Sequence, residues 1–211
     1  MTEEKTGLLI EIKRKAIHLP ALIIPFGLLY FPAWFSVPTL FSVAMLVLTV
    51  EILRLNFSPV QKLFYRFFGP LLREHERTRI TGSTALILSA TLCTLFFVSF
   101  SPEIAISPIG KLSMFYSFSF LILGDALAAV VGKRVGGPKL AGGKTIAGSL
   151  ACFFSCLTIY FVCRGAGIAE IDFTSALAAM ILTTVLEAVP IRLDDNLRVA
   201  PAVCALLWVM N

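Results

Sequence analysis

Long apolar stretches recur along the whole chain and limit what it can fold into. Hydrophobic residues make up 57% of the 211 residues and the mean hydropathy is +0.87, whereas only 15% of the residues are charged. One soluble core of this length cannot bury so large an apolar fraction, so we expect an integral membrane protein. Stretches of about 20 apolar residues cross the hydrocarbon layer as helices, and the sequence has them at 16–35, 36–55, 82–101, 110–131, 146–163, 173–190 and 199–211. The pattern predicts an all-α bundle of about seven transmembrane helices in a single domain, residues 1–211.

The basic residues are distributed unevenly between these spans. All 18 Lys and Arg residues except Lys111 and Arg164 lie before the first span or around the connections after the second, fourth and sixth spans. Because cytoplasmic segments of membrane proteins carry an excess of Lys and Arg, we expect the N-terminus and these three connections in the cytoplasm. This topology, together with anionic lipid headgroups, accounts for the net charge of +5, and we find no nucleic-acid-binding motif.

The richest polar cluster begins inside the fourth span. Asp125 lies about two helical turns before the end of that span, where a carboxylate needs a basic side chain or a metal ion as its partner. The connection that follows carries Lys133, Arg134, Lys139, Lys144 and the small residues Gly142, Gly143, Thr145, Gly148 and Ser149. Basic side chains, open backbone amides and a helix N-terminus together favour phosphate binding. This connection is not a Walker A loop, because Pro138 occupies the position of the first required glycine.

A second cluster leads into the first span. In a helix, Glu11, Arg14, Lys15 and His18 are spaced so that they share one face. A topology signal with an internal ion pair explains Arg14 and Lys15, but it explains His18, one turn deeper, less well. Both a structural pair and a binding face are consistent with this pattern.

Acidic residues gather before the third span and between the last two spans. The stretch 73–83 mixes charges, Arg79 among them, with Thr81, Gly82 and Ser83 at a helix start; it is either a solvated loop or an anion site. Glu187 is followed by Asp194, Asp195 and Asn196, whose oxygens suit Mg²⁺ or cap a turn. Glu51 with Arg54 is consistent with a structural ion pair or with a substrate contact.

Taken together, these motifs resemble the CTP-dependent polyprenol kinase family, which includes dolichol, phytol and farnesol kinases and CTP-dependent diacylglycerol kinases. The resemblance covers nearly the whole chain. The family's E-x-x-R-K-x-x-H element corresponds to Glu11–His18, and its acidic and basic stretch before T-G-S ends at Ser83. Its G-D-x-x-A-x-x-x-G-x-x-x-G element, followed by K-T-x-x-G-S, runs from Gly124 to Ser149. Its late E…D-N…P element is formed by Glu187, Asp195, Asn196 and Pro201.

The resemblance implies a membrane lipid kinase with its active site facing the cytoplasm. Such an enzyme transfers the terminal phosphate of CTP to the hydroxyl of a lipid alcohol: polyprenol, phytol, farnesol or diacylglycerol. CTP as the donor, in place of ATP, rests on the resemblance alone. Phosphoryl transfer needs positioning and charge neutralisation more than covalent chemistry.

The implied roles divide into three groups. Asp125, Glu187 and Lys144 are the predicted catalytic residues, with either carboxylate as the base. The predicted Mg²⁺ ligands are Asp125, Asp195, Asn196 and Glu187. The predicted nucleotide contacts are Lys133, Arg134, Lys139, Gly142, Gly143, Thr145, Gly148, Ser149, Arg14, Lys15, His18 and Arg79.

Two other functions stay open at this point. Phosphatidate cytidylyltransferases have a similar D…G…G…K-T-x-x-G region, but residues 192–198 lack the paired glycines and the D-R order of their late signature. A transporter or scaffold is the second alternative, although transporters place their polar sites near the membrane midplane. A loop that carries Lys144 at the membrane surface would favour the enzyme.

Overall fold

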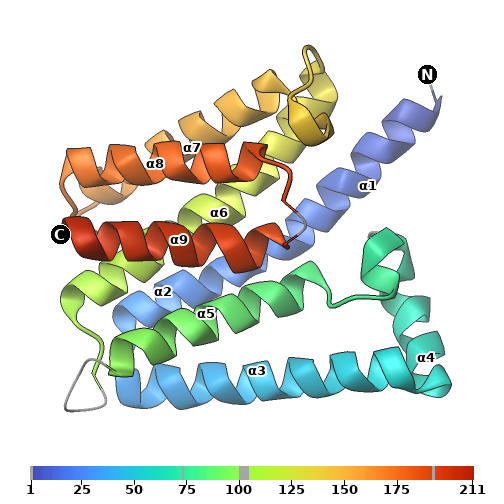
Figure 1. Ribbon diagram of the computed structural model, residues 1–211, viewed down its shortest axis with the longest axis horizontal. Coiled ribbons are helices and arrows are strands. Elements are labelled where there is room, and N and C mark those ends of the chain that lie inside the picture. Colours follow the sequence, from blue (N-terminus) through green and yellow to red (C-terminus); the bar gives the residue numbers. More distant parts are fainter. Residues whose placement is uncertain (1, 73, 100–104, 192) are drawn as a thin grey trace.

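The chain folds into a bundle of helices that lie along its longest axis, with α6 passing through the middle (Figure 1). The structure is a computed structural model that describes residues 2–72, 74–99, 105–191 and 193–211. The helices are α1 (Thr2–His18), α2 (Ile23–Tyr30), α3 (Ala33–Asn56), α4 (Ser58–Phe68), α5 (Gly82–Ser99), α6 (Pro108–Val135), α7 (Ile146–Gly165), α8 (Phe173–Ala188) and α9 (Asp195–Met210). No β-strand forms within these ranges, and the predicted all-α class is confirmed.

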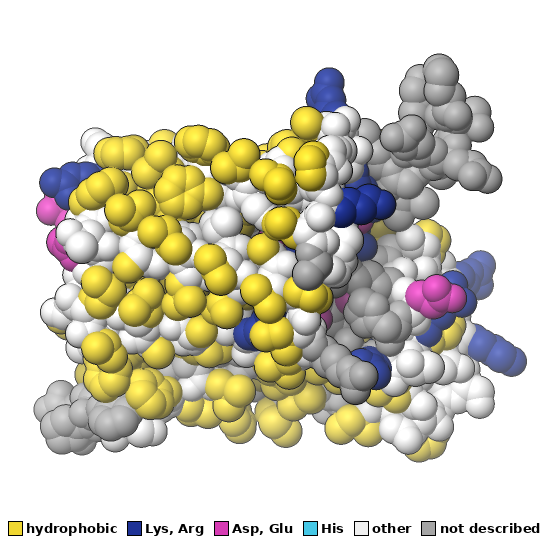
Figure 2. All heavy atoms as spheres, turned by 45° about the horizontal axis from the view of Figure 1, so that its top comes forward, with side chains coloured by type: hydrophobic (Ala, Val, Ile, Leu, Met, Phe, Trp, Pro, Cys, Tyr) yellow, Lys and Arg dark blue, Asp and Glu magenta, His cyan; other side chains and the backbone are white. Residues whose placement is uncertain are grey.

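Four helices, α3, α5, α6 and α7, are long and apolar enough to cross a membrane, and α8 is a shorter apolar helix. Figure 2 shows hydrophobic side chains over most of one face, with charged side chains gathered toward its two ends. Large apolar side chains such as Ile23, Trp34 and Val209 are more than 70% exposed, which suits contact with lipid and not with water. These features confirm a membrane helix bundle, whereas the number of seven spans stays a prediction.

The first two spans differ from their predicted boundaries. The helix that holds the first span starts earlier, as α1 at Thr2; the apolar part then continues through a 3₁₀ turn (Leu19–Leu22) and ends as α2 at Tyr30. Pro20 lies in this 3₁₀ turn and Pro25 in the first turn of α2; proline has no backbone N–H to donate, which favours such a break in an α-helix. The chain turns at Pro32, whose ψ of 151° is extended, so the boundary falls before residues 35 and 36. The predicted break was therefore placed too late.

The other boundaries follow from caps. Helix α9 begins at Asp195, before the predicted residue 199, because the Asp194 side chain accepts from the Asn196 backbone N–H at 2.9 Å. Helix α5 starts at Gly82 as predicted; residues 100 and 101 of that predicted span lie outside the described residues. Between α3 and α5 the chain forms α4, a short amphipathic helix.

Helix α6 is the centre of the bundle and contacts α1, α2, α5, α7, α8 and α9. Its residues from Ser113 to Ile122 are all buried. Small residues bring α6 and α7 close together: a Cβ on Gly148 would lie 2.8 Å from the Ala128 carbonyl oxygen. This tight contact fixes the position of the α6–α7 connection, where the central polar motif lies.

The two ends of the bundle carry different polar groups. At one end, the first turns of α5, α7 and α9 meet the last turns of α6 and α8 and the helix α1 (Figure 1). We call this the charged end; it holds the four predicted clusters around Glu11–His18, 74–83, 125–149 and 187–198. The opposite end holds Lys111, Arg164 in the last turn of α7, and the α7–α8 connection with Asp172.

Candidate active site

A cavity of about 370 Å³ lies at the charged end and is bounded by α1, α6, the α6–α7 connection, α8 and α9. We call it the charged cavity. Its lining residues are Glu11, Arg14, Asp125, Ala128, Ala129, Gly132, Lys133, Gly143, Lys144, Thr145, Gly148, Ser149, Glu187 and Asp195. Segments far apart in the sequence therefore contribute acids and bases to one partly open cavity.

The α6–α7 connection is a tight loop that directs Lys144 toward this cavity. The Leu140 N–H donates to the Lys144 carbonyl at 2.6 Å, and the Ile146 N–H donates to the Pro138 carbonyl at 3.1 Å. Gly143 has a φ of +81°, which L side chains rarely adopt, and it opens onto the cavity without a close neighbour. Thr145 caps α7 by accepting from the Gly148 N–H at 3.1 Å. The loop geometry thus depends on its glycine and threonine.

Lys144 joins two acidic residues from different helices. Its Nζ lies 2.8 Å from Glu187 Oε1 and 3.2 Å from Asp195 Oδ2, and it also donates to the Glu187 carbonyl. Burial lowers the pKa of Lys144, but the Glu187 and Asp195 carboxylates raise it by more, so this pKa lies above its ordinary value. Lys144 therefore stays charged at neutral pH.

The opposite wall of the cavity is built by α1 and α6. Lys15 is ion-paired with Asp125, and Lys133 Nζ lies 2.7 Å from Glu11 Oε2, while Arg14 pairs with Glu11 from within α1. Burial raises the pKa of Glu11, but the Lys133 hydrogen bond and the charges of Arg14, Lys133 and Lys15 outweigh it, so this pKa is lowered. Acids and bases alternate around the cavity.

One polar group in the cavity wall has no protein partner. Ser149 Oγ is buried and makes no hydrogen bond within the described residues, although Ser149 lines the cavity. Buried hydroxyls are normally hydrogen-bonded. Ser149 is therefore available to a ligand.

The structure brings most of the predicted site residues together. Those that line the charged cavity are Asp125, Glu187, Lys144, Lys133, Gly143, Thr145, Gly148, Ser149, Arg14 and Asp195. Lys15 touches it through its ion pair with Asp125. Gly148 also serves the α6–α7 contact described above, so its small size has a structural reason as well.

Six predicted nucleotide or metal residues do not line this cavity: His18, Arg79, Arg134, Lys139, Gly142 and Asn196. Gly142 packs on Pro190, since a Cβ there would lie 2.6 Å from the proline Cβ. Asn196 Nδ2 donates to the Gly82 carbonyl at 3.1 Å. The side chains of Arg79, Arg134 and Lys139 are exposed, and His18 lines an apolar groove next to α1.

The pair Glu51 and Arg54 has a structural role. Arg54 is fully buried and donates to Glu51 Oε2 at 2.7 Å, to the Glu76 carbonyl at 2.9 Å and to the Arg79 carbonyl at 2.7 Å. Glu51 accepts from the Thr81 N–H at 2.7 Å. These bonds hold the segment 76–81 against α3, so the ion pair places the start of α5.

Glu76 has a role that the sequence alone did not indicate. Its Oε1 accepts from the Gly82 N–H at 2.8 Å and so satisfies the first amide of α5. An acid a few residues before a helix start is the only signal for this, and the charged stretch 73–83 contains two such acids. Glu11, which lines the charged cavity, was noted as part of a cluster but not placed in the predicted site.

The described residues contain no group of three or more His, Cys, Asp or Glu side chains placed to hold a metal ion. Asp125, Glu187 and Asp195 do line one cavity, each beside a lysine. Mg²⁺ commonly uses one or two carboxylates and completes its shell with substrate phosphates and water. These three carboxylates therefore fit a Mg²⁺ ion that arrives with a nucleotide better than a Mg²⁺ ion that the protein holds permanently.

Two known proteins are similar to the chain in sequence. The chain is 28% identical over 199 residues to an uncharacterized protein of Rickettsia prowazekii, a match that covers 92% of this chain and 91% of the relative. It is 30% identical over 149 residues to CTP-dependent diacylglycerol kinase 1 of Schizosaccharomyces pombe, covering 68% of this chain and 62% of that kinase. No family model and no solved structure matches the chain. The chain is thus a membrane helix bundle with partial similarity to a lipid kinase.

Proposed function

We propose that this protein is a membrane lipid kinase that transfers the terminal phosphate of a nucleoside triphosphate to the hydroxyl of a lipid alcohol. The observation that carries the proposal is the charged cavity, in which Lys144, Lys133 and Arg14 converge with Asp125, Glu187 and Asp195 beside the N-terminus of α7. The similarity to a CTP-dependent diacylglycerol kinase supports the reaction class and favours CTP as donor.

The cavity suits a polyphosphate. Lys144 pairs with Glu187 and Asp195, and Lys133 pairs with Glu11. When a polyphosphate binds, the two lysines would exchange these carboxylates for phosphate oxygens and neutralise the phosphate charge. The helix N-terminus at Thr145 and the open backbone of Gly143 would donate hydrogen bonds, and Ser149 Oγ would gain the partner that it lacks. Mg²⁺, held by Asp125 with Glu187 or Asp195, would shield the charge of the transferred phosphate.

Asp125 is the carboxylate that we place nearest to the acceptor. It lines the charged cavity, and its ion pair with Lys15 ties it to the face of α1 that also carries His18 one turn further on. The acceptor hydroxyl would give its proton to this carboxylate as the new O–P bond forms. The bond between the β- and γ-phosphates then breaks, and the nucleoside diphosphate leaves.

The location of the site supports an enzyme over a transporter. Lys144 lies in a connection between two helices at the charged end, beyond the last turn of α6. Transporters bind near the bilayer midplane at broken helices. On the charge asymmetry of the sequence, we assign the charged end to the cytoplasm, where nucleotides are supplied.

Phosphate transfer by the purified protein in detergent or nanodiscs tests this proposal. The donors are γ-labelled CTP and ATP with Mg²⁺, and the acceptors are polyprenol, phytol, farnesol and diacylglycerol. We expect labelled lipid phosphate with CTP, and none after omission of Mg²⁺ or with Asp125→Asn. Formation of CDP-lipid from phosphatidate, with no labelled lipid phosphate, would establish a cytidylyltransferase in place of the kinase. Absence of both products and of nucleotide binding would favour a scaffold.

A further inference from the structure

A second cavity, of about 500 Å³, follows the membrane-embedded surface between α2, α3 and α5. We call it the tail groove. It extends from Ile17 and His18 along the first span to Phe31, and α3 and α5 form its other walls. The 13 residue steps from His18 to Phe31, at about 1.5 Å each, give a length of about 20 Å, two thirds of a hydrocarbon layer about 30 Å thick.

The tail groove is apolar along its length and polar at one end. Its wall carries two hydroxyls away from that end, but Ser36 donates to the Pro32 carbonyl at 3.0 Å and Thr39 donates to the Phe35 carbonyl at 2.7 Å. Those hydroxyls are satisfied by their own helix. At the charged end lie His18 and Ser83, and among the described lining residues only His18 has a titratable side chain. Such a surface complements a molecule with one small polar head and a hydrocarbon chain.

The polar end of the tail groove adjoins the charged cavity. A further cavity of about 340 Å³ shares Ile17, His18 and Ser83 with the tail groove and shares Arg14 with the charged cavity. Arg14 therefore lines both the charged cavity and this connecting cavity, and His18 lines both the connecting cavity and the groove. Since Lys15 pairs with Asp125, the carboxylate lies about one helical turn from the groove mouth.

We propose that the tail groove binds the hydrocarbon tail of the lipid alcohol substrate, with His18 and Ser83 at its mouth binding the hydroxyl. The inference rests on the proposed function. It moves His18 from the nucleotide, where the sequence placed it, to the acceptor. It also assigns a substrate class, which is single-chain lipids with one small head group. The first part of the chain, about 20 Å long, fills the groove, and any remainder of the chain stays in the bilayer.

Gly27 offers a way to fill the groove without disturbing the fold. It lines the groove, and a Cβ added there meets nothing closer than Phe31 Cδ2 at 3.9 Å. Gly27→Phe therefore places an aromatic ring in the groove, whereas Gly27→Ala adds only a methyl group there. Gly165→Phe is the matched control, because a Cβ at Gly165 has no neighbour within 4 Å and α7 ends there, away from the groove.

The experiment is photolabelling of the full-length protein in nanodiscs by hexadecan-1-ol that carries a diazirine at the tip of its chain. Labelled peptides are mapped by mass spectrometry, and the methyl ether of the same probe reports bulk lipid contact. We expect the alcohol to label the Phe31–Phe35 region at least fivefold more than the ether does. Gly27→Phe should remove this labelling, and Gly165→Phe should not. In His18→Ala, the alcohol and the ether should label the Phe31–Phe35 region equally.

Equal labelling by alcohol and ether in the wild type, or undiminished labelling in Gly27→Phe, overturns the inference. Thermal unfolding of each variant separates lost binding from lost folding, and Gly27→Ala should give an intermediate decrease. Kinase activity is measured on the same samples. Transfer to a lipid alcohol that Gly27→Phe leaves unchanged would refute the groove and keep the kinase, whereas specific labelling without transfer to any acceptor would refute the kinase and keep the groove.

Discussion

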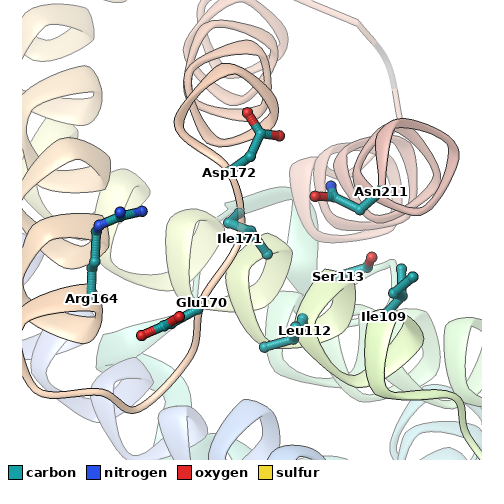
Figure 3. Close-up of a pocket in the computed structure, with 8 residues that line it drawn as sticks. All are labelled: Ile109, Leu112, Ser113, Arg164, Glu170, Ile171, Asp172 and Asn211. Carbon is teal, nitrogen blue, oxygen red and sulfur yellow. The ribbon is translucent and has the colours of Figure 1, made fainter.

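Both ends of this bundle contain a polar cavity, but they are built differently. The cavity at the opposite end, of about 440 Å³, is the larger and is lined by Arg164, Glu170, Asp172, Asn211 and their apolar neighbours (Figure 3). Its charged side chains are exposed, and those that are bonded contact groups nearby in the sequence: Asp172 accepts from the Thr174 N–H at 2.6 Å as the cap of α8. Arg164 donates to the Tyr160 hydroxyl one turn earlier.

At the charged end, by contrast, several charges pair between segments that are distant in the sequence, and some of them are buried. Lys15 is 4% exposed and pairs with an acid from α6, and Glu187 is 6% exposed and pairs with a lysine from the α6–α7 connection. Burying ions is costly, and exposed pairs add little to stability. Cavity volume therefore does not distinguish the two ends, whereas buried charges that converge from distant segments do.

The sharpest test of this comparison removes one carboxylate at each end by the same substitution. Asp125→Asn should lower kcat by about 10²–10⁴-fold, because it removes the proposed proton acceptor. Asp172→Asn keeps a side-chain oxygen to cap α8 and should leave kcat within about twofold. Both are measured by lipid phosphate formation. Comparable activity losses in the two variants would mean that the charged end is not the catalytic one.

Removal of one lysine at the charged end should affect both activity and stability. Lys144→Met leaves the buried Glu187 without its cation, so we expect a loss of about 1–3 kcal/mol in unfolding free energy and a loss of nucleotide binding. Arg164→Met, at the other end, should change neither by much because Arg164 is exposed. Thermal unfolding and nucleotide titration provide the two readouts. Normal nucleotide affinity in Lys144→Met would remove this residue from the site.

A smaller effect is expected from the backbone contact that supports the charged cavity. In Gly148→Ala the new Cβ would lie 2.8 Å from the Ala128 carbonyl oxygen, so α6 and α7 must separate, at a cost of about 1–3 kcal/mol. Gly165→Ala, in the same helix but with open space around it, should be neutral or slightly stabilising. Thermal melting in detergent compares the two. Similar melting temperatures would show that the α6–α7 contact is not tight.

The smallest predicted effect is the pH dependence of one ion pair. The pKa of Glu11 is lowered, so the stability it contributes is present above its ordinary value of 4.5 and is lost as pH falls through the lower, folded-state pKa. Glu11→Gln should therefore be less stable than wild type at pH 7 by about 1 kcal/mol. The difference should shrink as the pH falls below 4.5. A constant difference across that range would mean that Glu11 does not titrate in its pairs with Lys133 and Arg14.

The sequence predicted more of the fold than of the pairings within the site. The apolar spans and their polar connections were sufficient for the all-α membrane class, and the central motif identified Asp125, Lys144 and Thr145 as neighbours of one cavity. The break near residue 35 was placed too late, because hydropathy does not register the turn at Pro32. Arg79, Arg134 and Lys139 were predicted as nucleotide contacts, and they do not line the charged cavity.

The sequence by itself determined the features that depend on local composition. These are the helices where apolar residues continue, the loop with positive φ at Gly143, and the cap at Thr145. Only the tertiary structure decided that Lys15 meets Asp125, that Glu76 caps α5 and that His18 faces the tail groove. Those contacts join residues through the packing of helices on α6. Helix packing depends on the shapes of whole surfaces, and so the spacing of residues along the chain does not reveal it.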